Sequence, residues 1–252
     1  MARQKLGQHF LIRESVLNRI AAAVCPEPVP AVIEIGPGRG ALTRKLLERA
    51  SRVIAIELDP YLAEHLRRQY GADGRLEVVE ADVLKTDLKQ WSGAPVAGNL
   101  PYYITSPIVD QVLRAAPPRA VFLIQNEVAD RLTALPGSRE YGYLTVRTAF
   151  SATARKLFEV KPGAFHPPPK VDSAVVLLEP HAPPEGIGDG EAFLQFVGKC
   201  FAHKRKTLRN NLAGFFPKEL VDGCPEASLR AEQLSLEQFY VLWRRLTATA
   251  HP

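Results

Sequence analysis

The sequence contains little cysteine: three thiols, Cys25, Cys200 and Cys224, in a chain of 252 residues. They lie far apart, without the short spacings that are typical of cysteine ligands to zinc. The composition therefore excludes a disulfide-rich secreted scaffold and a zinc finger. We interpret the three cysteines as reduced thiols that pack inside the protein, and we expect no metal site.

Long hydrophobic runs are also missing. No stretch reaches the roughly 18 consecutive apolar residues of a membrane-spanning helix. The N-terminal sequence MARQKLGQHFLIRES is basic but lacks the apolar core of a signal peptide. We therefore expect a cytoplasmic protein with no membrane partner. No feature of the sequence indicates an obligate oligomer, so we expect a monomer.

The charge balance shows a modest positive excess. The formal net charge is +5 and the isoelectric point is about 9.1. A basic balance of this size is a weak indication of a nucleic-acid partner. It needs support from motifs before it identifies a function.

Between residues 31 and 126, short apolar runs alternate with amphipathic stretches, and no internal repeat is visible. Strands are predicted at 31–35, 52–58, 75–81, 94–98, 120–125 and 171–180, and helices at 41–50 and 60–70. Asp59 as N-cap and Pro60 at the first helical position mark the start of the second helix. This alternation predicts an α/β fold, in which a parallel sheet carries helices on both faces.

The composition changes near residue 180. The segment EPHAPPEGIGDGE is rich in proline and glycine, which predicts a linker over 181–190. Beyond it only helical periodicity occurs, clearest in EAFLQFVGKCFAHKRKTLRNNL and in SLEQFYVLWRRLTA, the second capped by Ser235. We therefore expect a ligand-binding α/β domain of residues 1–180 and a small helical domain of residues 191–252.

The segment EIGPGRGALT (34–43) joins the first predicted strand to the first predicted helix. Its glycines allow a sharp turn and a close approach of the backbone to a ligand. The pattern is G-x-G-x-G, whereas a dinucleotide site needs a final glycine one position later, where the helix packs beneath a pyrophosphate. The acidic Glu34 suits an amino-bearing or cationic ligand better than a phosphate. Taken alone, such a loop is equally compatible with an ordinary tight turn.

Two carboxylates follow the next strands: Glu57 ends the second predicted strand and Asp82 the third. A carboxylate at the end of the second strand can accept hydrogen bonds from two ribose hydroxyls. A group at Asp82 can meet an adenine amino group. Either residue alone would be a solvated strand end. Together with the glycine loop they indicate an adenosine-containing ligand held without a phosphate clamp, and S-adenosylmethionine fits that description.

The segment PVAGNLPYYITSPI (95–108) ends the fourth predicted strand. Asn99 offers an amide oxygen as acceptor, and the Leu100 carbonyl, restricted by Pro101, offers a second. Two acceptors suit an exocyclic amino group, and Tyr102 offers a ring on which a base can stack, worth about 1–3 kcal/mol. The pattern predicts methyl transfer to the amino group of an unpaired base, with positioning as the main contribution of the protein. The alternative is a turn whose tyrosines pack in the core.

Six segments carry a family resemblance, in the order GQHFL, EIGPGRGALT, IELD, ADVL, NLPYYITSPI and FHPPPKVDSAVV. With FAHKRKTLRNNL near the C-terminus, they resemble the rRNA adenine N6-dimethyltransferases, and within that family the bacterial small-subunit branch. The resemblance covers almost the whole chain, whereas NLPY alone would indicate only an amino methyltransferase. It implies a Rossmann-like class I methyltransferase sheet with helices on both faces, plus a small all-helical C-terminal domain.

The resemblance also implies a reaction: S-adenosylmethionine-dependent transfer of two methyl groups to the N6 of each of two adjacent adenosines near the 3′ end of 16S rRNA. This occurs in the small ribosomal subunit and carries a role in ribosome assembly. The implied cofactor contacts are His9, Leu11, Gly36, Gly38, Glu57, Leu58, Asp82, Val83 and Asn99. The family usually has asparagine at the position of His9, and histidine can still donate a hydrogen bond there.

Phe165 begins the stiff segment FHPPPKVDS. In the resemblance it joins Asn99, Leu100 and Tyr102 as a catalytic residue, on the opposite side of the target adenine from Tyr102. The alternative is a hydrophobic plug at a sheet edge.

The segment KCFAHKRKTLRNN carries the predicted RNA contacts Lys204, Arg205, Lys206 and Arg209, with no acidic residue between them. On a helix, residues 205 and 209 would share a face, as would 206 and 209. Such a surface binds phosphates without reading sequence. The alternative is an ordinary solvated basic helix. Two further functions remain open: a large-subunit rRNA adenine methyltransferase of the antibiotic-resistance type, and an assembly factor that acts mainly by binding.

Overall fold

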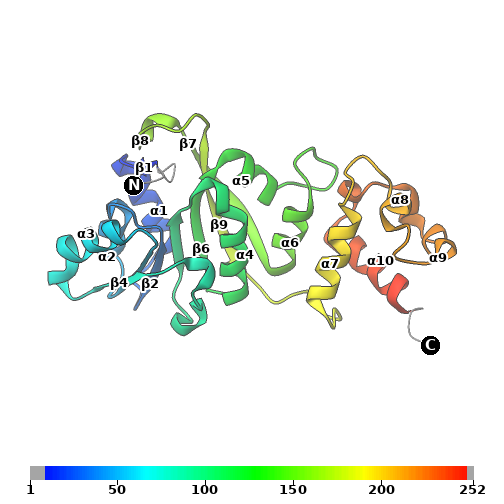
Figure 1. The fold of residues 1–252 in the computed structure, drawn as a ribbon, viewed down its shortest axis with the longest axis horizontal. Helices are drawn as coiled ribbons and strands as arrows, with labels where there is room; N and C mark the ends of the chain where they lie inside the picture. Colours follow the sequence, from blue (N-terminus) through cyan, green and yellow to red (C-terminus); the bar gives the residue numbers. More distant parts are fainter. Residues whose placement is uncertain (1–8, 249–252) are drawn as a thin grey trace. The chain divides into compact units, whose positions relative to one another are not determined.

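A computed structural model of the chain describes residues 9–248 (Figure 1). Contacts divide the chain into two compact units. Unit 1 comprises Met1–Ala129 and Thr153–Pro180, and unit 2 comprises Asp130–Ala152 and His181–Pro252. Within the described residues, no helix has the length and apolar character needed to cross a membrane.

Unit 1 is built on a seven-stranded sheet with the order β4-β3-β2-β5-β6-β9-β7. Its strands are β2 (Val32–Ile35), β3 (Val53–Glu57), β4 (Leu76–Glu80), β5 (Val96–Asn99), β6 (Ala120–Gln125), β7 (Ala152–Val160) and β9 (Ser173–Pro180). The strands from β4 to β6 in this order are parallel, and β9 runs antiparallel to β6. All six predicted strands are present, with small differences at their ends.

Helices cover the sheet of unit 1. They are α1 (Glu14–Val24), α2 (Ala41–Leu47), α3 (Pro60–Tyr70) and α4 (Thr105–Ala115). Helix α5 (Asn126–Leu132) begins in unit 1 and ends in unit 2. Unit 1 also contains the 3-10 helices η1 (Gly71–Asp73), η2 (Val83–Lys85), η3 (Leu88–Trp91), η4 (Tyr102–Ile104) and η5 (Pro162–Ala164). Every residue of β2 and β3 is buried, so both faces of these strands are covered. The predicted cap of α3 is confirmed: the Asp59 carboxylate accepts a hydrogen bond from the Tyr61 N–H at 2.8 Å.

A second, two-stranded sheet in unit 1 was not predicted. It pairs β1 (Phe10–Leu11) with β8 (Phe165–His166) in antiparallel register. Two-residue strands leave no periodic pattern in a sequence, which is why this pairing was missed. It brings the segment before α1 beside the proline-rich segment that precedes β9.

Unit 2 is helical. It contains α6 (Tyr143–Ser151), α7 (Gly190–Cys200), α8 (Leu208–Leu212), α9 (Lys218–Asp222), α10 (Leu236–Ala248), η6 (Pro225–Ser228) and η7 (Ala231–Gln233). Its core includes Phe193, Phe196 and Phe239, all fully buried. The predicted cap of α10 is present, because the Gln238 N–H donates to Ser235 Oγ at 3.2 Å and the Ser235 N–H to Gln238 Oε1 at 2.9 Å.

The division into units differs from the expected one in the segment 130–152. We expected this segment in the domain of residues 1–180, but it groups with the C-terminal helices. The reason is its apolar content: Val146 and Phe150 of α6 join the core of unit 2, where the Phe150 ring lies 5.5 Å from that of Phe193.

The prediction of one continuous helix over 191–212 is wrong. Helix α7 ends at Cys200, turns follow, and α8 begins at Leu208. The buried Asn211 side chain stabilises this break, since its Nδ2 donates to the carbonyl oxygens of Cys200 at 2.8 Å and His203 at 3.1 Å. The residues 205 and 209 therefore do not share a helix face.

Candidate active site

The register of the parallel strands gathers the predicted site residues at one edge of the sheet. Ile35 pairs with Ile56 on one side and with Gly98 on the other, so Gly36, Glu57 and Asn99 follow side by side. Strand β2 has β3 on one side and β5 on the other, which makes this edge the switch point of the sheet. Ligands of open α/β sheets bind at such a point, outside the carboxyl ends of the strands.

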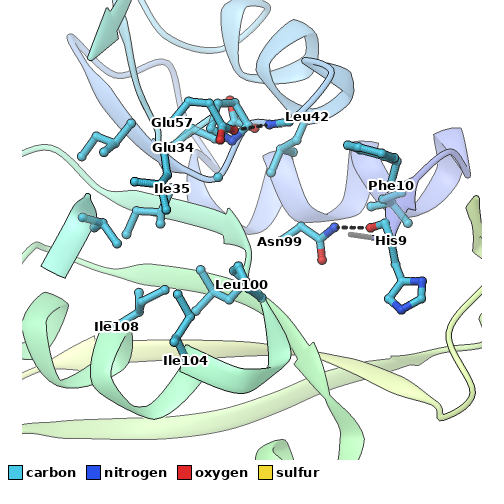
Figure 2. A pocket seen from close by; sticks show the side chains of 18 of the residues that line it. His9, Phe10, Glu34, Ile35, Leu42, Glu57, Asn99, Leu100, Ile104 and Ile108 are labelled. Atoms are coloured by element: carbon cyan, nitrogen blue, oxygen red, sulfur yellow. Dashed lines mark hydrogen bonds between the residues drawn. The ribbon is translucent and has the colours of Figure 1, made fainter. Parts of the chain in front are cut away.

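A pocket opens at this edge, and Figure 2 shows part of its lining. It is lined by all but one of the predicted cofactor and catalytic residues: His9, Leu11, Gly36, Gly38, Glu57, Leu58, Asp82, Val83, Asn99, Leu100 and Tyr102. The exception is Phe165. All these residues belong to unit 1.

Glu57 holds the glycine loop in place. Its carboxylate accepts hydrogen bonds from the Gly38 N–H at 3.1 Å and from the Asp59 N–H at 2.9 Å. Gly36 and Gly38 have φ values of 66° and 59°, the left-handed region that glycine adopts without strain. Burial raises the pKa of Glu57, and the backbone hydrogen bonds oppose this shift. Each carboxylate oxygen keeps a lone pair for a ligand hydroxyl.

Asp82 lies at the N-terminus of η2, where Oδ1 accepts a hydrogen bond from the Leu84 N–H at 3.0 Å. The apolar side chains of Leu58 and Val83 line the same pocket. A carboxylate beside apolar side chains suits a flat heteroaromatic ring that carries an amino group.

Asn99 is oriented by a backbone group. Its Nδ2 donates to the carbonyl oxygen of His9 at 3.0 Å, and Figure 2 shows the amide oxygen turned away from that contact. Within residues 9–248, Oδ1 has no hydrogen-bond partner from the protein. The Leu100 N–H donates to the Leu123 carbonyl at 3.0 Å, which fixes the following peptide to β6. The Asn99 oxygen is therefore available as an acceptor at the pocket.

Tyr102 is held at both its hydroxyl and its ring. The hydroxyl lies 2.7 Å from Ser173 Oγ, at the start of β9. The ring stacks on that of His9, with centroids 5.9 Å apart and an angle of 28° between the planes. Tyr102 lines the pocket, and stacking of a base on its ring stays a prediction.

Phe165 does not lie where the prediction placed it. It pairs with Leu11 in the small sheet, is 3% exposed, and packs in the core cluster that contains Leu17 and Ile20. The pairing of β1 with β8 directs it into the core. Its position agrees with the alternative of a hydrophobic plug at a sheet edge, and not with a wall opposite Tyr102.

Two features of the site were missed. Phe10 lines the pocket and packs on the glycine loop, since a Cβ added at Gly38 would lie 3.1 Å from its ring. Glu34, recognised only by its charge, is buried and accepts a hydrogen bond from the Thr43 hydroxyl at 2.6 Å. The signal for Phe10 was its place between two predicted contacts, His9 and Leu11.

The predicted RNA contacts of unit 2 fall into two classes. Lys204 donates to the Arg139 carbonyl at 2.5 Å, and Arg209 forms an ion pair with Asp222 at 2.6 Å. Arg205 and Lys206 are exposed and have no ion pair with any described residue. The fold thus supplies an acidic partner that the local sequence lacks.

The chain is similar to known proteins over almost its whole length. The model of the ribosomal RNA adenine dimethylase family matches residues 1–247. The chain belongs to this family. It is 44% identical to ribosomal RNA small subunit methyltransferase A of Acidobacterium capsulatum, over 96% of this chain and 90% of the relative.

Solved structures agree with this assignment. A dimethyladenosine transferase from Plasmodium falciparum matches with a TM-score of 0.82 and 26% identity, covering 96% of this chain and 98% of that one. The 23S rRNA methyltransferase ErmE matches with a TM-score of 0.74 and 32% identity, covering 94% and 99%. The chain has the class I methyltransferase fold that the resemblance implied. In its described residues, no group of three or more His, Cys, Asp or Glu side chains could hold a metal ion.

Proposed function

We propose that this chain transfers two methyl groups from S-adenosylmethionine to the N6 of each of two adjacent adenosines near the 3′ end of 16S rRNA. The observation that carries the proposal is Asn99, whose amide nitrogen is occupied by the His9 carbonyl while its oxygen remains available at the pocket. An acceptor fixed in this way suits the N–H groups of an exocyclic amine.

The same pocket fits the cofactor. Glu57 would accept hydrogen bonds from the ribose hydroxyls, and Asp82 with Leu58 and Val83 would hold the adenine. The glycine loop would allow the remaining part of the cofactor to approach the backbone. When bound, S-adenosylmethionine supplies an electrophilic methyl group.

The residues of the chain then contribute positioning. Asn99 and the Leu100 carbonyl would accept hydrogen bonds from the amino group and draw its lone pair out of conjugation with the ring. Tyr102 would support the base by stacking. No side chain needs to act as a strong general base, because most of the barrier can be lowered by orientation. The adenosines must be unpaired or extruded to reach this pocket.

The partner that we propose is the small ribosomal subunit, bound by a monomer in the cytoplasm. Arg205 and Lys206 of the helical C-terminal domain would contact RNA phosphates, because both are exposed and free of ion pairs with described residues. The choice of subunit is supported by the 44% identity to the small-subunit relative, compared with 32% to the 23S enzyme.

The test uses purified protein, labelled S-adenosylmethionine and small subunits that lack the modification. RNA is digested and analysed for N6,N6-dimethyladenosine, with large subunits and naked rRNA in parallel. We expect dimethyladenosine in small subunits alone, near two per particle. Label in the large subunit would instead assign the chain to the resistance-type methyltransferases.

A second experiment separates chemistry from binding. Glu57→Ala should abolish methyl transfer and leave binding to the small subunit intact, because Glu57 lies in the cofactor pocket. Binding is measured by whether the variant sediments together with the small subunit, and methyl transfer by the dimethyladenosine assay above. Loss of methylation and of binding together would count against a separable role in assembly.

A further inference from the structure

One residue, His9, contacts three segments at the acceptor end of the pocket. Its carbonyl oxygen accepts the Asn99 Nδ2–H at 3.0 Å, and its ring stacks on that of Tyr102. Its Nδ1 lies 2.8 Å from the carbonyl oxygen of Pro167, in the proline-rich segment before β9. Because a carbonyl only accepts hydrogen bonds, Nδ1 must carry the proton in this contact.

These contacts concern the acceptor side of the site. Asn99 and Tyr102 are the residues that the proposed function assigns to the adenine, whereas Glu57 and Asp82 are assigned to the cofactor. Neither the hydrogen bond of His9 Nδ1 nor its ring contact involves Glu57, Asp82 or the glycine loop. His9 also lines the pocket with the predicted cofactor contacts, and its own role as a cofactor contact stays a prediction of the resemblance.

We propose that His9 is a positioning residue for the target base, which sets the ring of Tyr102 and the segment at Pro167 relative to the amide of Asn99. The inference rests on the proposed function and deepens it. The bond from Tyr102 to Ser173 fixes only the hydroxyl end of the tyrosine. A single hydrogen bond leaves the ring free to tilt about that point, and the His9 ring removes this freedom.

The hydrogen bond to Pro167 fixes the orientation of the His9 ring. The small sheet pairs Phe10, which follows His9, with His166, which precedes Pro167, so the two segments are already held together through the backbone. The bond from Nδ1 to the Pro167 carbonyl then fixes the imidazole itself in the plane that stacks on Tyr102. Three contacts therefore define one arrangement of the acceptor end: the stacking of the His9 ring on Tyr102, the bond from Tyr102 to Ser173, and the bond from Asn99 to the His9 carbonyl.

The test compares His9→Ala, His9→Phe and a matched control, His65→Ala, whose exposed histidine lies on α3 away from the pocket. Two quantities are measured for each full-length protein. The first is the single-turnover rate of methyl transfer to unmodified small subunits at saturating cofactor. The second is the dissociation constant of S-adenosylmethionine by calorimetry.

We expect His9→Ala to lower the rate by about tenfold or more, as a misplacement of reacting groups does, and to change cofactor affinity by less than about twofold. His9→Phe keeps a flat ring against Tyr102 and should recover part of the rate. In a Tyr102→Ala background, His9→Ala should have little further effect, because the group that it positions is gone. His65→Ala should behave as the unchanged protein.

Three results would overturn the inference. These are a loss of cofactor affinity as large as the loss of rate, an unchanged rate in His9→Ala, and independent effects of the His9 and Tyr102 substitutions. Retained cofactor binding also shows that a variant is folded. Failure of the proposed function is distinguishable, because the unchanged protein and His65→Ala would then form no dimethyladenosine in any subunit, and the inference would fall with it.

Discussion

At the scale of single residues, Glu34 is a carboxyl group that the fold buries without an ion pair to any described residue. It is 1% exposed, and it accepts a hydrogen bond from the Thr43 hydroxyl at 2.6 Å. Burial raises its pKa to about 8, the Thr43 hydrogen bond opposes the shift, and nearby Glu57 adds to it. The carboxyl group is therefore mostly protonated at neutral pH in the free protein.

This burial makes the free energy of unfolding depend on pH. Between about pH 5 and 8, the folded state holds a proton on Glu34 that the unfolded state has lost, so stability falls as pH rises, by at most about 1.4 kcal/mol per pH unit. Glu34→Gln removes this group and keeps an oxygen to accept the Thr43 hydroxyl. We expect the variant to gain stability over the unchanged protein as pH rises from 5 to 8. Urea unfolding of both proteins across this range measures the difference, and parallel curves would contradict the expected burial of a neutral carboxyl group.

At the scale of elements, the contact between β2 and β5 aligns the glycine loop with Asn99. Gly98 allows this contact: a Cβ added to it would lie 2.7 Å from the Ile35 carbonyl oxygen and 2.9 Å from Leu100 Cδ2. Since the first of these is a backbone atom within a buried sheet, the clash cannot be relieved by a change of rotamer.

We therefore expect Gly98→Ala to lower the free energy of unfolding by about 1–3 kcal/mol. It should also weaken binding of S-adenosylmethionine, because Asn99 and Gly36 would move apart. Gly163→Ala is the matched control, since a Cβ there meets nothing within 4 Å. Denaturant unfolding and calorimetry check both effects; equal stability of the two variants would show that the sheet tolerates the added methyl group.

The break between α7 and α8 depends on one buried amide. Asn211 is 4% exposed, donates to the carbonyls of Cys200 and His203, and accepts from the His203 N–H at 3.1 Å. Asn211→Ala leaves these groups without a partner, which costs about 1–3 kcal/mol for each group that stays buried. We expect a loss of about 3 kcal/mol overall, whereas the exposed neighbour Asn210 should tolerate alanine with little change. Thermal unfolding of the two variants compares them, and similar melting temperatures would refute this role for Asn211.

The elements could be predicted to different extents. The strands β2 to β6 followed from apolar runs with glycine or polar ends, because a buried parallel strand leaves a continuous hydrophobic pattern. The helix predicted at α7 was too long, because the amphipathic pattern continues through 201–207. The hydrogen bonds of Asn211 that end it leave no periodic signal in the sequence. The place of Phe165 was also hidden, because it depends on a pairing of two-residue strands far apart in the sequence.

At the scale of the whole molecule, the positive charge is less available than the sequence suggests. The net charge is +5, but Lys204 and Arg209 interact with groups distant in the sequence: Arg139 and Asp222. Arg205 and Lys206, in contrast, lie in the turns after α7 and are exposed. The site at the sheet edge could be predicted from strand ends, whereas the free cations could be identified only after folding had assigned the ion pairs.

Binding to RNA should follow this distinction. Log affinity falls as log salt concentration rises, and each phosphate contact that is lost makes the magnitude of this slope smaller by about 0.7–0.9. We therefore expect Arg205→Ala with Lys206→Ala to reduce the slope for small-subunit binding by about 1–2. The pair Lys204→Ala with Arg209→Ala removes the same charge from the same segment but should reduce the slope less, because these two cations already have partners within the protein. Binding titrations between about 50 and about 300 mM salt, a range that brackets the physiological ionic strength of about 150 mM, compare the two double variants. Equal slopes for the two double variants would contradict this prediction. They would mean that the RNA contact lies outside this segment, or that the partners of Lys204 and Arg209 within the protein do not affect RNA binding.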